Sequence, residues 1–133
     1  MKKIDHIGIA VKDLEASVAL FSRLFKKPPF HQEEVKSEHL DVSFFELGDT
    51  KIELMQAHSP ESKVQKFLDK KGEGIHHVCF EVENIEEEME RLRQEGFQPL
   101  TEKPYLGALN KLVCFLHPKT TNSVLIELCQ KIK

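Results

Sequence analysis

Apolar and polar residues alternate in short runs along the chain, and this alternation predicts strands. The run HIGIAV, which starts at His6, places an apolar side chain at every second position, and HVCFEV, which starts at His77, does the same. Successive side chains on a strand point to opposite faces of a sheet. Each run therefore predicts a strand with one apolar face and one face that carries a histidine.

The two runs begin two copies of a longer pattern. When HIGIAVKDLE is aligned with HVCFEVENIE, His, Val and Glu coincide, and Asp13 aligns with Asn84. Both residue types cap helices, and the segments ASVALFSRLFKK and EEEMERLRQEGF follow them, the second ending at Gly96. Each copy closes with a Phe, a turn and a strand that ends Ile-Glu-Leu, as in FELGDTKIEL and FLHPKTTNSVLIEL.

Two further strand candidates, DVSFFEL and KLVCFLH, complete a β-α-β-β-β order in each copy. We therefore predict an α+β fold that forms a single domain over 1–133. Its two modules cover about 3–57 and 74–131. The helical pattern ESKVQKFLDKK lies in a connector over about 58–73. The duplication favours a pseudo-symmetric fold rather than a solenoid.

Four residues lie opposite the apolar rows by this count of strand positions. They are His6 and His77 on the opening strands, and Glu53 and Glu127 on the closing strands. His76, next to His77, falls on the other face, beside the helices. Isolated His and Glu residues on strands often face solvent, but agreement of all four with the repeat favours one shared metal site. Imidazole and carboxylate together suit divalent Co, Mn, Ni, Fe or Zn, with two octahedral positions left for water or substrate.

Composition excludes several classes of function. A net charge of −3, 40% hydrophobic and 31% charged residues indicate a folded protein without the basic surface that nucleic acid or an acidic membrane requires. No apolar run reaches membrane-spanning length, and MKKIDHIGIAV enters a strand pattern without a signal-peptide core, so we expect a cytoplasmic protein. Three cysteines without CxxC spacing are expected to be buried, reduced thiols.

The motifs GEGIHH, FLHPK and VLIELCQ, with DHIGIAVKDLEASV and LGDTKIELMQ, resemble the vicinal oxygen chelate superfamily (glyoxalase, bleomycin resistance protein and dioxygenase) and, within it, the methylmalonyl-CoA epimerases. The resemblance runs almost end to end. It implies two modules that form a cupped mixed sheet around one divalent metal, for which we favour cobalt, in a homodimer with an acyl-CoA substrate. It implies the same four metal ligands, His6, Glu53, His77 and Glu127.

The activity implied is epimerisation of methylmalonyl-CoA at C2, by abstraction of the α-proton through a metal-stabilised enolate. Two bases on opposite sides of the α-carbon would perform it. Glu127 is our first candidate base and Glu53 the second, with metal-bound water as a third. Lys103 and Lys111 are candidates for contact with coenzyme A phosphates.

The chain departs from the family pattern at several positions. A common helical Tyr is Phe21, and a Leu-Gly pair after the first helix is Phe25-Lys26. A glutamate proposed as a base in some members aligns near Ser43, and a Gly-rich pair before the last strand is Asn122-Ser123. These departures leave the four ligands in place, but they leave the second base open.

Two other functions remain possible from the residues. A lactoylglutathione lyase uses the same fold and a similar ligand set, although the epimerase-like motifs argue against it. A non-catalytic small-molecule-binding protein of the same fold is the other alternative, and retention of the four ligands argues against that. The remaining histidines receive no metal role: His117 is expected at a strand end, and His31, His39 and His58 in loops.

Overall fold

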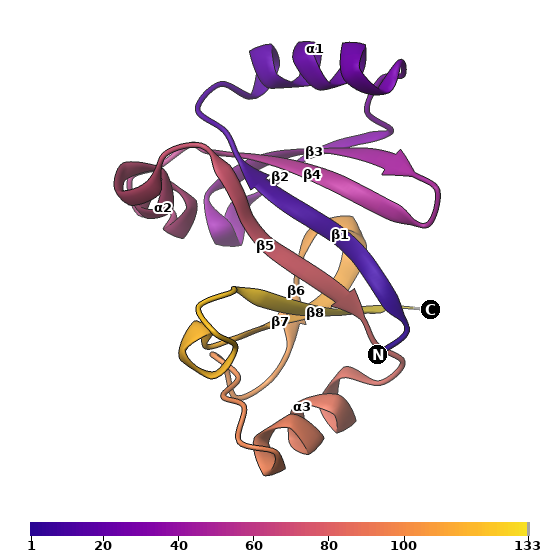
Figure 1. Ribbon diagram of the computed structural model, residues 1–133, viewed down its shortest axis with the longest axis vertical. Helices are drawn as coiled ribbons and strands as arrows, with labels where there is room; N and C mark the ends of the chain where they lie inside the picture. Colours follow the sequence, from indigo (N-terminus) through magenta and orange to yellow (C-terminus); the bar gives the residue numbers. More distant parts are fainter. Residues whose placement is uncertain (133) are drawn as a thin grey trace. The chain divides into compact units, whose positions relative to one another are not determined.

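Each copy of the sequence repeat folds into four strands and one helix in the computed structural model, which describes residues 1–132 (Figure 1). The chain divides into two compact units. The N-terminal unit is His6–His76, and the C-terminal unit combines Met1–Asp5 with the chain from His77 onward. The predicted connector helix belongs to the N-terminal unit.

The first repeat forms a mixed four-stranded sheet in the order β2-β3-β4-β1, with β1 parallel to β4 and the other pairs antiparallel. Its helix α1 lies along one face of this sheet (Figure 1). The elements in chain order are β1 (Lys3–Ala10), α1 (Leu14–Phe25), β2 (His31–Val35), a 3-10 turn (Lys36–Glu38), β3 (Leu40–Leu47), β4 (Thr50–Ala57) and the connector helix α2 (Lys63–Lys71).

The second repeat has the same order, β5-β8-β7-β6, with β5 parallel to β8. The helix α3 packs against β7 and β8. The elements are β5 (Gly74–Glu81), α3 (Ile85–Gln94), β6 (Tyr105–Leu106), a 3-10 turn (Ala108–Asn110), β7 (Lys111–Leu116), a 3-10 turn (Pro118–Thr120) and β8 (Ile126–Lys131). The predicted α+β class, with two β-α-β-β-β modules, is confirmed.

The predicted helix caps are present in both units. The Asp13 carboxylate accepts a hydrogen bond from the N–H of Ala16 at 3.0 Å, and the side-chain oxygen of Asn84 accepts one from the N–H of Glu87 at 3.2 Å. Each bond pairs one of the N–H groups that a helix start leaves without an intrahelical partner. Gly96, two residues beyond α3, has a φ of 95°, which explains why glycine stands there.

The apolar rows predicted from the alternation form the cores beneath the helices. In the N-terminal unit, Val11, Phe45 and Leu54 are buried against side chains of α1. In the C-terminal unit, the buried cluster combines residues of α3 with apolar positions of the strands: Val82, Ile85, Met89, Leu92, Cys114, Leu116 and Leu128. Removal of this apolar surface from water is the main term that stabilises each unit. The opposite strand faces therefore carry the polar residues considered below.

The polar segment that begins at His31 is a strand rather than the loop we predicted for this histidine. Its sequence, HQEEV, lacks an apolar row because β2 is the outer strand of its sheet and is half exposed. The other two histidines predicted in loops lie outside strands, His39 in the turn before β3 and His58 directly after β4. Among the helices of residues 1–132, none has the length and apolar character needed to cross a membrane.

Candidate functional site

A buried histidine and a buried glutamate form a pair in the N-terminal unit. His6 of β1 and Glu53 of β4 are each 6% exposed, and the Nε2 atom of His6 lies 3.3 Å from Oε1 of Glu53. Parallel pairing of the two strands, in which Gly8 is opposite Glu53, brings the side chains together. The edge of the His6 ring meets Phe44 of β3, with ring centroids 5.8 Å apart and an interplanar angle of 89°. This contact restricts the rotation of the imidazole.

The C-terminal unit contains the equivalent pair. The Nε2 atom of His77 on β5 lies 3.0 Å from Oε1 of Glu127 on β8, and these residues are 3% and 7% exposed. Cys79 is opposite Glu127 across the parallel strands. Phe115 meets the edge of the His77 ring at 5.5 Å and 82°. The two units therefore build the same local arrangement from residues at matching positions of the repeat.

The repeat extends to hydrogen bonds that tie each helix to the strand carrying the glutamate. The side-chain oxygen of Gln56, three residues after Glu53, accepts from the N–H of Leu14 at 2.6 Å. The side-chain oxygen of Gln130 accepts from the N–H of Ile85 at 2.8 Å in the same way. The start of each helix is thus held at the end of the strand that positions the glutamate.

The donor types in each pair fit a divalent metal. A buried carboxylate is costly unless positive charge or hydrogen bonds compensate for it, and imidazole nitrogen with carboxylate oxygen is a common ligand set for first-row divalent ions. Each unit thus offers one nitrogen and one carboxylate that are removed from bulk water, as a ligand set requires.

The positions of the adjacent histidines agree with the count of strand faces. His77 is buried and contacts Glu127 and Phe115. His76 is half-buried and meets Phe67 of α2, with ring centroids 5.0 Å apart and an interplanar angle of 77°. The prediction that His76 lies beside a helix is therefore confirmed. Its neighbour His77 is the one that faces the glutamate.

Ser43 does not share the face of Glu53. It is fully buried, and its hydroxyl oxygen accepts a hydrogen bond from the side-chain amide of Gln32 at 2.9 Å. Phe44, the next residue on β3, takes the face that contacts His6. The family glutamate that aligns near Ser43 therefore has no carboxylate counterpart at this residue.

A buried ion pair in the C-terminal unit was not predicted. The Lys111 ammonium donates to the Asp5 carboxylate at 2.8 Å, although the two residues are 106 positions apart in sequence. Asp5 is fully buried and Lys111 is 7% exposed. The signal in the sequence was Asp5 itself, a charged residue in the otherwise apolar row of the first strand. The engagement of Lys111 by Asp5 argues against its predicted contact with coenzyme A phosphates.

Burial also controls the cysteine thiols. Burial, and after it a hydrogen bond with Cys129 and the negative charge of Glu127, raise the pKa of the Cys79 thiol well above its ordinary value. Burial raises the pKa of the Cys114 thiol too. All three cysteines are buried and free, as predicted. The Cys79 and Cys114 thiols therefore remain protonated near neutral pH and are poor nucleophiles.

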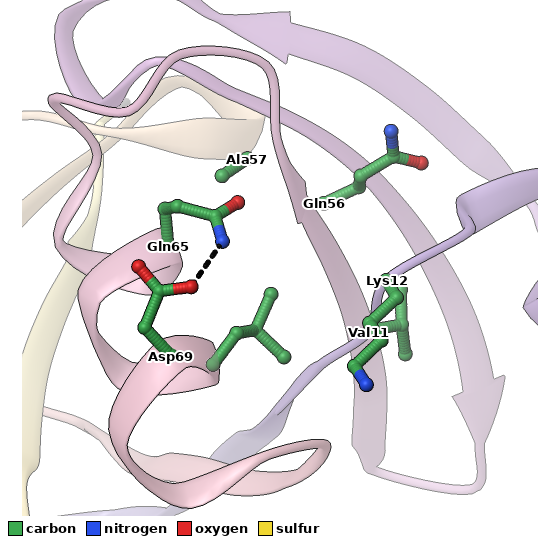
Figure 2. A pocket seen from close by; sticks show the side chains of 7 residues that line it. Val11, Lys12, Gln56, Ala57, Gln65 and Asp69 are labelled. Atoms are coloured by element: carbon green, nitrogen blue, oxygen red, sulfur yellow. Dashed lines mark hydrogen bonds between the residues drawn. The ribbon is translucent and has the colours of Figure 1, made fainter.

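A pocket of about 410 Å³ opens in the N-terminal unit between α2 and the ends of β1 and β4 (Figure 2). Figure 2 shows the Gln65 amide donating to the Asp69 carboxylate on its helical wall, at 2.8 Å. The residues that line it are Val11, Lys12, Gln56, Ala57, Gln65, Leu68 and Asp69. Gln56 points to the opposite face of β4 from Glu53 because the two are three residues apart. This pocket is therefore separate from the His6–Glu53 pair.

The fold and the duplicated pair define a class of protein, in which two β-α-β-β-β units each present one buried His–Glu pair. Residues 5–115 match the family model described as "Glyoxalase/Bleomycin resistance protein/Dioxygenase superfamily". The chain belongs to this superfamily and, within it, to the methylmalonyl-CoA epimerase family.

Three relatives illustrate the match. The ethylmalonyl-CoA/methylmalonyl-CoA epimerase of Cereibacter sphaeroides is 38% identical, over 96% of this chain and 97% of that protein. The uncharacterized protein YqjC of Bacillus subtilis is 35% identical, over 98% and 93%. A variant of Streptomyces coelicolor methylmalonyl-CoA epimerase, solved in complex with 2-nitronate-propionyl-CoA, is 30% identical, with a TM-score of 0.95 over 98% of this chain and 95% of that chain. The predicted family, a family of isomerases, is confirmed.

Proposed function

We propose that the protein epimerises methylmalonyl-CoA at C2, by removal of the α-proton and its return to the other face of the carbon. The observation that carries this proposal is the duplicated buried pair, His6–Glu53 and His77–Glu127, in a chain of the epimerase family. Removal of the proton leaves negative charge on the thioester oxygen. The reaction therefore needs bases and a positive charge in the same place.

The four residues of the two pairs are the proposed ligands of a single divalent ion, with cobalt favoured. When bound, this ion supplies the positive charge that stabilises the developing enolate. The imidazoles of His6 and His77 are held by their edge contacts with Phe44 and Phe115, which fixes the direction of their Nε2 atoms.

The two carboxylates are the proposed bases, Glu127 first and Glu53 second. They occupy equivalent positions of a duplicated unit, as removal of a proton from one side and delivery to the other require. Both are buried, so bulk water does not compete freely for the proton. Ser43 cannot be the second base, because its side chain is a hydroxyl bonded to Gln32.

The substrate class follows from the relatives. One is named for ethylmalonyl-CoA and methylmalonyl-CoA, and another was solved with a propionyl-CoA that bears an anionic nitronate at C2. We propose a homodimer in the cytoplasm as the working form, and three buried free thiols agree with a reducing compartment. Sedimentation of the purified protein tests the dimer.

The decisive experiment is proton exchange in deuterated water. Protein stripped of metal and reloaded with cobalt is mixed with one epimer of methylmalonyl-CoA, and the α-proton is followed by NMR. Metal-dependent loss of that signal, with appearance of the other epimer, supports the proposal. Absence of exchange by the loaded protein, with turnover of the methylglyoxal–glutathione hemithioacetal, would instead identify a lactoylglutathione lyase.

A further inference from the structure

We infer that the N-terminal unit carries a separate binding site for a divalent first-row metal ion, such as Zn²⁺ or Cu²⁺, formed by Glu34, Asp41 and His58. Each of the three offers one ligand atom, and these atoms all lie within 4.8 Å of one another. The Nε2 atom of His58 is 3.2 Å from Oε2 of Glu34. One imidazole and two carboxylates are a donor set that such ions bind.

Strand pairing places the two carboxylates side by side. Glu34 of β2 and Asp41 of β3 are directly opposite each other in the antiparallel ladder. Like charges in this position destabilise a sheet unless positive charge lies between them. Asp41 is half-buried, and its carboxylate forms no side-chain hydrogen bond or ion pair with any residue in 1–132. A bound cation would both relieve the repulsion and give this carboxylate a partner.

A second imidazole lies next to the first. The backbone N–H of His58 donates to the backbone carbonyl oxygen of His39 at 3.0 Å, and the two rings meet edge-on with centroids 6.2 Å apart. His39 has a φ of 56°, a conformation that few non-glycine residues adopt. The Nε2 atom of His39 is 3.5 Å from Oε2 of Glu61. The loops at this end of the sheet thus gather two imidazoles and a third carboxylate around the Glu34–Asp41–His58 site.

This site shares no residue with the His6–Glu53 pair and lies on the other face of the sheet. Asp41 and Phe44 are three residues apart on β3 and point to opposite faces, and Phe44 is the residue that contacts His6. The inference therefore stands independently of the proposed epimerase activity. It implies that the protein binds more than one equivalent of metal.

The test is a titration of the metal-free, full-length protein with Zn²⁺ alone, followed by calorimetry. We expect two classes of Zn²⁺ site in the wild-type protein. The tight class is the proposed catalytic site, and the weaker class is the inferred site of Glu34, Asp41 and His58. In the double variant Glu34→Gln/His58→Ala, the weaker class should fall in affinity by at least about tenfold, while the tight class is retained. Electron paramagnetic resonance with Cu²⁺ would show loss of the signal from the weaker class in the same variant. Circular dichroism confirms that the variant is folded.

The matched control is the double variant His31→Ala/Glu33→Gln. It also removes a His–Glu pair from β2, one whose Nε2–Oε1 distance is 2.9 Å, but it leaves the inferred site intact. The weaker class of Zn²⁺ site should keep its affinity in this control and should lose affinity in Asp41→Asn. A single class of site in the wild-type protein, or equal loss of the weaker class in both double variants, would overturn the inference. A weaker class that responds to these variants as expected, in a protein that shows no exchange of the α-proton, would count against the proposed function and leave this site standing.

Discussion

The Nε2 atom of His77 lies 3.0 Å from the Oε1 atom of Glu127, whereas the ring of the preceding histidine meets Phe67 on the connector helix. Adjacent residues of one strand are thus divided between a buried polar pair and a helix contact. This division is the direct result of side-chain alternation along β5. It provides a comparison between two histidines that differ by a single position.

Substitution of His77 by alanine should abolish activity and metal binding at the proposed catalytic site, whereas His76→Ala should preserve both. The first change removes a proposed ligand, and we expect metal affinity to fall by more than about 100-fold, beyond the usual effect of losing an outer-shell contact. The second removes a ring contact with Phe67 and no proposed ligand. Metal content after dialysis against cobalt, measured beside exchange activity, checks the prediction. If His76→Ala lost the metal and His77→Ala kept it, the proposed ligand set would be wrong.

Glu127→Gln should slow removal of the α-proton from one epimer of the substrate much more than from the other. Loss of one base of a pair slows proton transfer by about 10²–10⁴-fold on its own side of the α-carbon. Exchange from the two epimers in deuterated water should then differ strongly, and Glu53→Gln should reverse the preference. Each epimer is followed separately by NMR. Glu95→Gln, an exposed position after α3, is the control and should exchange both epimers at the wild-type rate. Equal slowing of both epimers in the two variants, each shown to retain its metal, would exclude the two-base assignment.

The four proposed ligands were predictable because the pattern that reveals them is local and occurs twice. Strand alternation places each His or Glu opposite an apolar row, and the repeat supplies a second instance that supports the first. The Gln56–Leu14 and Gln130–Ile85 hydrogen bonds occur at equivalent positions of the repeat as well, but no local property of a glutamine indicates a bond to a helix 42 or 45 residues away. Only the fold brings these partners together.

Two other features escaped prediction for physical reasons. The Asp5–Lys111 pair joins residues 106 positions apart, so no periodicity connects them. We predicted a loop at His31 because HQEEV has no apolar row. An outer strand that is half exposed needs no such row. Tertiary pairing with β3 determines that segment.

Asp5→Asn should destabilise the protein strongly. It leaves the ammonium of Lys111 buried beside a neutral amide, and removal of one partner of a buried pair costs about 3–5 kcal/mol. The double variant Asp5→Leu/Lys111→Met removes both charges and should recover most of the free energy of unfolding, measured by urea denaturation. The comparison is Glu90→Gln, which breaks an exposed contact with Arg93 and should change stability by less than about 1 kcal/mol. Similar losses in Asp5→Asn and Glu90→Gln would show that the buried pair contributes little.

Lys26→Gly should stabilise the protein. Lys26 ends α1 with a φ of 59°, in the left-handed conformation that glycine adopts without steric cost. Relief of this cost should raise the free energy of unfolding by about 1 kcal/mol. Lys27→Gly is the matched control, because Lys27 is not among the residues of positive φ and should gain nothing. A gain in both variants, or in neither, would contradict the explanation from backbone conformation.

The three cysteines should resist modification in the folded protein. Burial raises the pKa of the Cys79 and Cys114 thiols, so the reactive thiolate remains scarce until pH rises above those raised values. Cys129, which is 1% exposed, is closed to reagents by packing. Reaction with a chromogenic disulfide reagent at pH 8 should be slow and should increase little between pH 7 and 8, whereas guanidinium should release three thiols at once. Rapid reaction of one thiol without denaturant would show that a cysteine is accessible in the native protein and that burial does not control its chemistry.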